Sequence, residues 1–166
     1  MDNIKVIKIN QKHAEEFFEL YKTVSLSDFG KWSKEAKEKW FSDDYSLEYW
    51  KNLLEIGNLP VFVAKDDGKF VGYVMLEGIN FGVGYLGWIG VLKEYQGKGI
   101  GSVLMQTVEE WSKNNGIHKL ELETQEPELQ MFYEKHGFVL EGIRKNSWQN
   151  LDNYMFGKEL TSSNNN

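Results

Sequence analysis

The residues with the clearest potential for chemistry lie in a short glycine-rich segment past the middle of the chain. They are, in order, Gln96, Gly97, Lys98, Gly99, Ile100, Gly101 and Ser102. Glycine carries no Cβ, so its backbone can approach an anion closely. A helix that begins here offers unpaired N–H groups and a partial positive charge, and Lys98 adds a cation beside them. The segment therefore favours a pyrophosphate-binding loop.

Two other phosphate-binding patterns do not fit this loop. A P-loop needs Ser or Thr directly after Gly-Lys, and here Gly99 follows Lys98. The dinucleotide fingerprint needs a third glycine three positions after the second, where this chain has Ile100 or Ser102, depending on the frame. Taken alone, the loop is also compatible with a tight turn that binds no ligand.

The elements around the loop must hold it in place. Residues 85–92 are a β-rich run with two internal glycines, which predicts a strand with a bulge or a close approach by another backbone. From Ile100 to Trp111 apolar residues recur at helical spacing, and residues 119–124 alternate Leu with Glu, as in a strand. A strand, helix and strand of these lengths predict a right-handed crossover and a parallel pair.

The rest of the chain supplies further helices and antiparallel strands. We expect an α/β fold with a mixed, mostly antiparallel sheet, one central parallel pair and about four to five helices. The predicted elements are a strand over 6–9, helices after Asn10, over 33–41 and after Ser46, a hairpin of 61–64 and 70–75, a helix from Pro127 to before Gly137, and a closing pair of 138–143 with 153–160.

Length and composition indicate an ordinary globular protein. The 166 residues suit one domain over 1–160, followed by a low-complexity tail over 161–166 that we expect to be disordered. The chain has no Cys, which excludes disulfides, thiolate metal sites and a Cys nucleophile. His13, His118 and His136 show no metal-ligand spacing, so no metal is expected.

The net charge and the lengths of the apolar segments indicate which partners and which location to expect. The net charge of −6 disfavours nucleic acid and anionic membranes and favours a cationic partner. The start of the chain has no secretory pattern, and its apolar runs are too short to cross a bilayer. We therefore expect a cytoplasmic protein.

Two segments resemble motifs of the GNAT superfamily of N-acetyltransferases. Its central motif is Arg or Gln, two residues, Gly, one residue, then Gly or Ala, which Gln96, Gly99 and Gly101 satisfy. About thirty residues later, residues 132–138 resemble the second motif, an aromatic helix end followed by Gly-Phe. A weaker resemblance runs from 6 to 160. Many members carry an Asn that contacts CoA seven residues before the helix Tyr, and this chain has Glu126 there.

The resemblance implies transfer of an acetyl group from acetyl-CoA to a primary amine. In the family the parallel pair splays apart around the acyl-pantetheine. N–H groups from Gly97 to Ser102 would then hold the pyrophosphate. The backbone groups that would pair with the pantetheine belong to Ile89, Gly90, Val91 and Leu92.

The reaction needs an acid and a route for the proton of the amine. An ammonium with a pKa near 10 must be deprotonated before it attacks. By the motif match, Tyr133 is the acid that protonates the leaving thiolate, although it also lies at helical spacing from Leu129 for simple packing. Glu123 is our candidate base and Glu77 its competitor; a solvated carboxylate at a strand end explains either residue as well. Without Cys, direct attack in a ternary complex is expected.

An aromatic cluster falls where the family builds its acceptor side. It is either a wall for an apolar or cationic substrate or helix packing on the sheet. Its members are Phe29, Trp32, Trp40, Phe41, Tyr45, Tyr49 and Trp50. The acceptor stays open between a polyamine, an amino acid, a protein N-terminus, a lysine side chain and an aminoglycoside. A non-catalytic acyl-CoA-binding or regulatory module is the alternative function, and a homodimer is open because dimers are frequent in the family.

Overall fold

The computed structural model describes residues 3–160, so the predicted disorder of 161–166 lies outside the described residues. The helices in this part of the chain are α1 (Ala14–Asp28), α2 (Lys34–Lys39), α3 (Leu47–Ile56), α4 (Ile100–Asn114) and α5 (Gln130–Lys135). The strands are β1 (Lys5–Lys8), β2 (Val61–Asp66), β3 (Lys69–Asn80), β4 (Val83–Val91), β5 (Lys119–Thr124), β6 (Val139–Arg144) and β7 (Asn153–Glu159).

The strands form one sheet in the order β1-β2-β3-β4-β5-β7-β6. The pairs β1/β2, β2/β3, β5/β7 and β6/β7 are antiparallel. The pair β4/β5 is parallel, with its ladder running from Val83 opposite Lys119 to Tyr85 opposite Glu121. In the chain α4 lies between these two strands. The predicted mixed sheet with one parallel pair is therefore confirmed, and so is the strand, helix and strand order.

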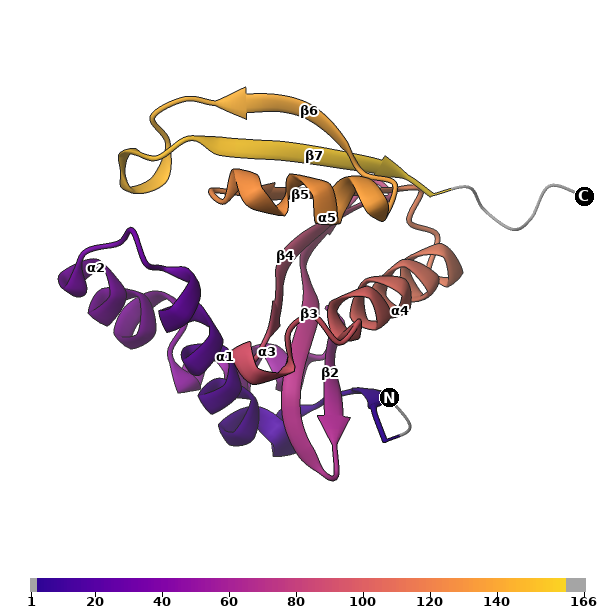
Figure 1. Ribbon diagram of the computed structural model, residues 1–166. Helices are drawn as coiled ribbons and strands as arrows, with labels where there is room; N and C mark the ends of the chain where they lie inside the picture. The colour runs from indigo at the N-terminus through magenta and orange to yellow at the C-terminus, as the bar shows by residue number, and fades with distance from the viewer. Residues whose placement is uncertain (1–2, 161–166) are drawn as a thin grey trace, which may run out of the picture. The chain divides into compact units, whose positions relative to one another are not determined.

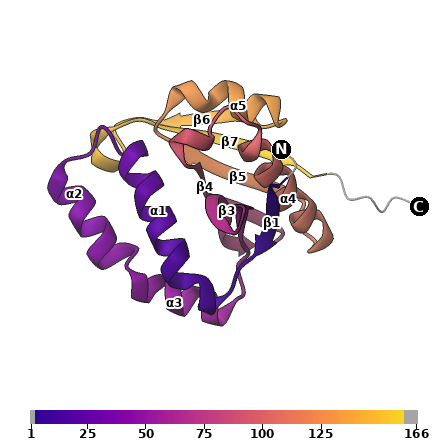
Figure 2. The same cartoon turned by 60° about the horizontal axis from the view of Figure 1, so that its bottom comes forward.

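One compact unit comprises residues 3–75 and 88–107. Within it α1 packs against α3 (Figures 1 and 2). Their rings meet at close range, since the Trp50 ring centroid lies 5.0 Å from that of Phe17 and 4.9 Å from that of Tyr21. All three side chains are fully buried. The helical spacing of aromatic residues after Asn10 thus marks the core-facing side of α1, as amphipathic periodicity predicts.

The second compact unit comprises residues 76–87 and 108–160. Leu120 and Leu122 of β5 are buried, while the alternate residues Glu121 and Glu123 belong to the opposite face of the strand. Helix α5 lies along one face of the strands β5, β7 and β6, and its Tyr133 ring is 5.4 Å from that of Phe156 (Figure 1). The predicted alternation of β5 is therefore confirmed.

Two predicted helices differ in detail from what the structure contains. The helix predicted over 33–41 ends as α2 at Lys39 and continues as a wider π-turn over Trp40–Asp44. The Trp40 indole N–H donates to the Tyr21 hydroxyl at 2.7 Å and the ring stacks on Tyr45, contacts that favour this wider turn. The helix predicted from Pro127 starts as a 3₁₀ turn over Pro127–Leu129 and becomes α5 only at Gln130.

We expect Leu104→Ala to lower the free energy of unfolding by about 2–5 kcal/mol, because it leaves a cavity in the core. Leu104 is fully buried, and the room it occupies depends on Gly72, where a Cβ would come within 3.2 Å of its Cδ1. Urea unfolding measures the change. Gln106→Ala on the exposed side of the same helix is the control and should change stability by less than about 0.5 kcal/mol. Equal losses in both variants would contradict the assigned core.

Candidate functional site

The glycine loop, residues 96–101, connects a short 3₁₀ turn at Lys93–Tyr95 to the start of α4. Gly97 and Gly99 have φ of 73° and 77°, the left-handed region that other residues adopt at a cost. A Cβ at Gly97 would meet nothing within 4 Å, so the backbone there faces open space. The first helical bond runs from Val103 N to Gly99 O at 3.1 Å. The amides just before it form the N-terminal end of the helix, which attracts anions.

Two side chains of the loop are engaged in holding it. The Gln96 side-chain amide donates to the Val91 carbonyl at 3.0 Å and so ties the loop to the end of β4. The Lys98 ammonium lies 4.9 Å from the centre of the Tyr95 ring. The observed bond shows that Gln96 positions the loop, and its predicted contact with the cofactor stays a prediction.

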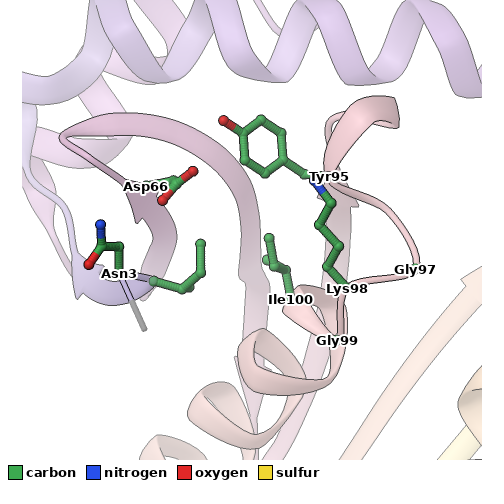
Figure 3. Close-up of a pocket in the computed structure, with 8 residues that line it drawn as sticks. Asn3, Asp66, Tyr95, Gly97, Lys98, Gly99 and Ile100 are labelled. Carbon is green, nitrogen blue, oxygen red and sulfur yellow. The ribbon is translucent and has the colours of Figure 1, made fainter. Parts of the chain in front are cut away.

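A hollow of about 760 Å³ opens beside the loop. Figure 3 shows Tyr95, Lys98 and the glycines on one side of it and Asn3 and Asp66 on the other. The hollow leaves the loop backbone accessible. The basic group of its wall, Lys98, lies on the loop side, so an anion is favoured at the loop rather than beside Asp66.

At the end of β4, the edge that faces β3 is already hydrogen-bonded. The Leu92 N–H donates to the Val71 carbonyl of β3 at 2.9 Å. Hydrogen-bonding groups alternate between the two edges of a strand, so those of Ile89 and Val91 point to the edge away from β3. At Gly90 a Cβ would lie 2.5 Å from Val24 Cγ1, which requires glycine there. The side chain of Val24 thus approaches Gly90, and the Gly90 backbone in turn lies close to β3, since a Cβ at Gly72 would come 3.0 Å from the Gly90 carbonyl oxygen.

Tyr133 lies on α5 and is 5% exposed. Its ring packs beside those of Phe138 and Phe156, at 6.1 Å and 5.4 Å between centroids. Leu129, the packing partner suggested by helical spacing, is 41% exposed. Tyr133 therefore packs against Phe138, just before β6, and Phe156 of β7, and the role of its hydroxyl as an acid stays a prediction.

Glu123 is held by two neighbours in the second unit. Arg144 Nη1 donates to both carboxylate oxygens, at 3.1 and 3.0 Å, and Asn153 Nδ2 donates to Oε2 at 2.7 Å. The Glu123 side chain is 13% exposed and Asn153 is fully buried. Our sequence reasoning missed both partners. A polar Asn inside an apolar strand was the available signal, because buried polar groups are nearly always hydrogen-bonded.

Tyr85 belongs to the same polar region and was also missed. Its burial, together with the negative charges of Glu123 and Glu77, raises the pKa of its hydroxyl above the usual tyrosine value, while Arg144 opposes the shift. Glu77 passes over Gly87, where a Cβ would overlap its side chain. The absence of a side chain at Gly87 therefore leaves space for the side chain of Glu77, the second candidate base.

The aromatic cluster divides into a buried and a half-buried part. Trp50 and Phe29 are buried, which agrees with helix packing. Trp32, Trp40 and Tyr45 are half-buried, with Trp32 stacked on Phe29 and Trp40 stacked on Tyr45, both at 4.3 Å. The role of these rings as a substrate wall stays a prediction.

Two features are absent from residues 3–160. No group of three or more His, Asp or Glu side chains there is arranged to hold a metal ion. None of the helices in this part of the chain has both the length and the apolar character to span a bilayer.

Comparison with known sequences points to one family. The model of the acetyltransferase (GNAT) family matches residues 15–138. N-alpha-acetyltransferase 30 of Schizosaccharomyces pombe is 33% identical over 107 residues, covering 61% of this chain and 71% of that protein. Streptothricin acetyltransferase A of Bacillus subtilis is 26% identical over 139 residues, covering 80% and 79%.

Solved structures share the fold. The PaiA N-acetyltransferase of Thermoplasma acidophilum, in complex with coenzyme A, aligns with a TM-score of 0.80 at 24% identity, over 94% of this chain and 98% of that one. The ribosomal-protein-S18-alanine N-acetyltransferase of Escherichia coli aligns with a TM-score of 0.75 at 15% identity, over 98% and 97%.

We expect Tyr85→Phe to weaken the loss of stability at alkaline pH. Above about pH 10 the unfolded chain gives up the Tyr85 proton, whereas the raised pKa keeps it on the folded protein. Loss of this proton favours the unfolded state as pH rises. The free energy of unfolding of the wild type therefore falls. Urea unfolding between about pH 8 and about pH 11 measures the slope, which should be shallower in the variant. Parallel curves for the two proteins would show that Tyr85 titrates normally.

Proposed function

Since the chain belongs to the acetyltransferase (GNAT) family, we propose that it transfers the acetyl group of acetyl-CoA to a primary amine by direct attack in a ternary complex. The observation that carries the proposal is the glycine loop at the start of α4. Gly97 and Gly99 adopt positive φ, the backbone at Gly97 faces open space, and the loop is tied to β4 by Gln96. This combination suits a pyrophosphate that binds main-chain amides.

The residues around the loop would hold acetyl-CoA, which supplies the activated acetyl group. Main-chain amides from Gly97 to Ser102 would bind the pyrophosphate, with Lys98 as the nearby cation. At the end of β4 the outward-facing groups of Ile89 and the Val91 N–H are the best candidates to pair with the pantetheine, since the Leu92 N–H is bonded to Val71 and the Val91 carbonyl already accepts from Gln96. Gly90 and Leu92 would line the same path without donating from their amides.

The proposed acid is the hydroxyl of Tyr133, which would donate its proton to the leaving sulfur. A tyrosine hydroxyl carries its proton at neutral pH and can donate it to a thiolate. The incoming ammonium must give up one proton before attack, so the sum is one amide, one free thiol and one released proton. A main-chain N–H near Val91 is the proposed donor to the acetyl oxygen.

The proposed acceptor is a primary amine on a small molecule or a peptide. The two similar proteins carry different names, N-alpha-acetyltransferase 30 and streptothricin acetyltransferase A, so both kinds belong in the first test. The net charge of −6 favours a cationic acceptor. We further propose a cytoplasmic location and a single catalytic domain over residues 1–160; a homodimer remains to be tested.

We expect Gly97→Ala to raise the Kd for CoA by about tenfold or more, because the new Cβ points into the space that the pyrophosphate needs. Gly68→Ala in the β2–β3 turn is a matched control. Gly68 also has positive φ, 90°, and its Cβ would also meet nothing within 4 Å. Both variants should lose about 1 kcal/mol of stability from the strained backbone, but only Gly97→Ala should weaken CoA binding in calorimetry. Unchanged CoA binding in Gly97→Ala would remove the loop from the site.

We expect Tyr133→Phe to lower kcat by roughly 100-fold or more while CoA binding stays within about twofold, because only the proton donor is lost. Release of free thiol from acetyl-CoA measures turnover, with diamines, amino acids and N-terminal peptides as acceptors. Wild type that binds CoA but acetylates no amine would favour the alternative, a non-catalytic acyl-CoA-binding module. Wild type that does not bind CoA would overturn the proposed function.

A further inference from the structure

Helix α5 is too short to fix the position of Tyr133 by its own bonds. It spans the six residues Gln130–Lys135 and follows directly on the 3₁₀ turn at Pro127–Leu129. Isolated helices shorter than about 12 residues are marginal in water, so the place of such a helix is set by packing and by what binds its ends. The end nearest Tyr133 is the C-terminal one. The contacts at that end therefore decide where the Tyr133 hydroxyl lies.

The C-terminal end of α5 closes in a Schellman turn. The Phe138 N–H donates to the Tyr133 carbonyl at 3.1 Å. The Gly137 N–H donates to the Glu134 carbonyl at 2.9 Å, and Gly137 has φ of 80°, the left-handed conformation that this turn requires there. The apolar contact that accompanies such turns joins Tyr133 to Phe138, whose ring centroids are 6.1 Å apart. Both the carbonyl and the ring of Tyr133 are thus tied to the turn.

One cation bonds to this turn from outside the helix. The Lys158 ammonium of β7 donates to the carbonyl of His136, the residue between the helix and Gly137. The same ammonium donates to Oε1 of Glu109, in the second half of α4, at 2.6 Å. A Cβ at Gly137 would lie 3.3 Å from Lys158 Cε, so the lysine side chain runs directly over the turn. A positive charge here also suits the negative end of the helix dipole.

The ion pair of Lys158 and Glu109 is largely withdrawn from solvent. The side chain of Lys158 is 19% exposed and that of Glu109 is 12% exposed. Moving two charges out of water costs about as much as their attraction returns, so a buried ion pair is weak evidence for stability. Both residues belong to the same compact unit as α5. The pair therefore calls for an explanation other than stability, and the conformation that it selects at the end of α5 supplies one.

We propose that Lys158, held by Glu109, is a positioning residue for Tyr133, and that it acts by fixing the turn that ends α5. The proposal rests on the proposed function, in which the Tyr133 hydroxyl is the acid. Proton transfer requires a donor within hydrogen-bond reach of its acceptor, and small displacements of a reacting group cost large factors in rate. In this role Lys158 exchanges no proton with the substrate. Its ammonium fixes the His136 carbonyl, and the bonds of the turn fix Tyr133 relative to that carbonyl.

Lys158→Met is the first test, because it keeps an unbranched side chain and removes the ammonium. We expect kcat to fall about tenfold, since the placement of the acid changes. The KM for the amine and the Kd for CoA should stay within about twofold, since no binding group is removed. An unchanged kcat in Lys158→Met would contradict the positioning role.

Lys119→Met is the matched control for this substitution. Lys119 on β5 is likewise paired with carboxylates, those of Glu121 and Glu141, and its side chain is 24% exposed. It makes no bond to the turn that ends α5 among the contacts of the described residues. Its loss should leave kcat within about twofold of wild type. An equal fall in kcat in both variants would show that the loss of any paired lysine slows turnover, and the specific role of Lys158 would be wrong.

A combined substitution separates positioning from loss of stability. Lys158→Met leaves the Glu109 carboxylate buried without its cation, which by itself destabilises a protein. Lys158→Met together with Glu109→Leu removes both charges and should bring the melting temperature to within about 4 °C of wild type. The His136 carbonyl still lacks its donor in this variant, so kcat should stay about tenfold low. Recovery of kcat together with the melting temperature would show that the pair serves stability alone and would overturn the proposal.

The same substitution in the Tyr133→Phe variant tests whether Lys158 acts through the acid. If Lys158 only places the Tyr133 hydroxyl, Lys158→Met should not lower the residual kcat of Tyr133→Phe by more than about twofold. A further tenfold fall, roughly additive with the loss of the hydroxyl, would mean that Lys158 affects turnover in another way. Release of free thiol from acetyl-CoA measures kcat in each case. An additive result therefore rejects the assignment.

Wild type and Tyr133→Phe are measured first, so that the possible failures stay distinct. Wild type that does not bind CoA defeats the proposed acetyltransferase function itself. A wild-type kcat in Tyr133→Phe defeats the role of the acid, and the positioning role falls with it. A reduced kcat in Tyr133→Phe with an unchanged kcat in Lys158→Met defeats only the role of Lys158.

Discussion

The passage of the backbone from β4 into α4 is the constraint on which the glycine loop depends. A helix start leaves main-chain amides without helical acceptors, and a strand end leaves groups without a ladder. Here the Leu92 N–H completes the pairing with Val71, and the Gln96 side chain takes the Val91 carbonyl. Positive φ at Gly97 and Gly99 then turns the chain into the helix. The main-chain amides at the start of α4 have no helical acceptor, so they are the groups that can bind an anion.

Glycine has a second role in this fold, as the space for a neighbouring side chain. Gly90 leaves space for Val24 and Tyr73, and Gly87 for Glu77. Gly72 leaves space for the side chains of Val91 and Leu104 and for the Gly90 carbonyl. A single methyl group at any of them would force a packed or charged neighbour to move, and interiors are too dense to absorb such a shift freely. The strands that flank the loop are therefore constrained in composition as strongly as the loop itself.

In the second unit, charged and polar side chains bond to one another where β6 ends and β7 begins. Glu123, Arg144, Asn153 and Gln125 come from three separate stretches of the chain, yet they form one hydrogen-bonded group at the base of the β6–β7 turn. Such a group is stable only when all members are satisfied, since an unpaired buried polar atom costs more than a bond returns.

Features that depend on local pattern could be predicted from the residues alone. Spacing, turn chemistry and the handedness of crossovers predict five such features. They are the glycine loop, the helical face of α4, the Leu–Glu alternation of β5, the hairpin at Asp67 and Gly68, and the parallel pair.

The partners of each side chain, in contrast, are known only from the tertiary structure. Glu123 meets Arg144, 21 positions later, and Asn153, 30 positions later. The Gln96 side chain donates to the Val91 carbonyl, and the Trp40 indole donates to the Tyr21 hydroxyl. Periodicity records which face a residue occupies, but the identity of its neighbour depends on strand order and register, and these are set by packing of the whole chain.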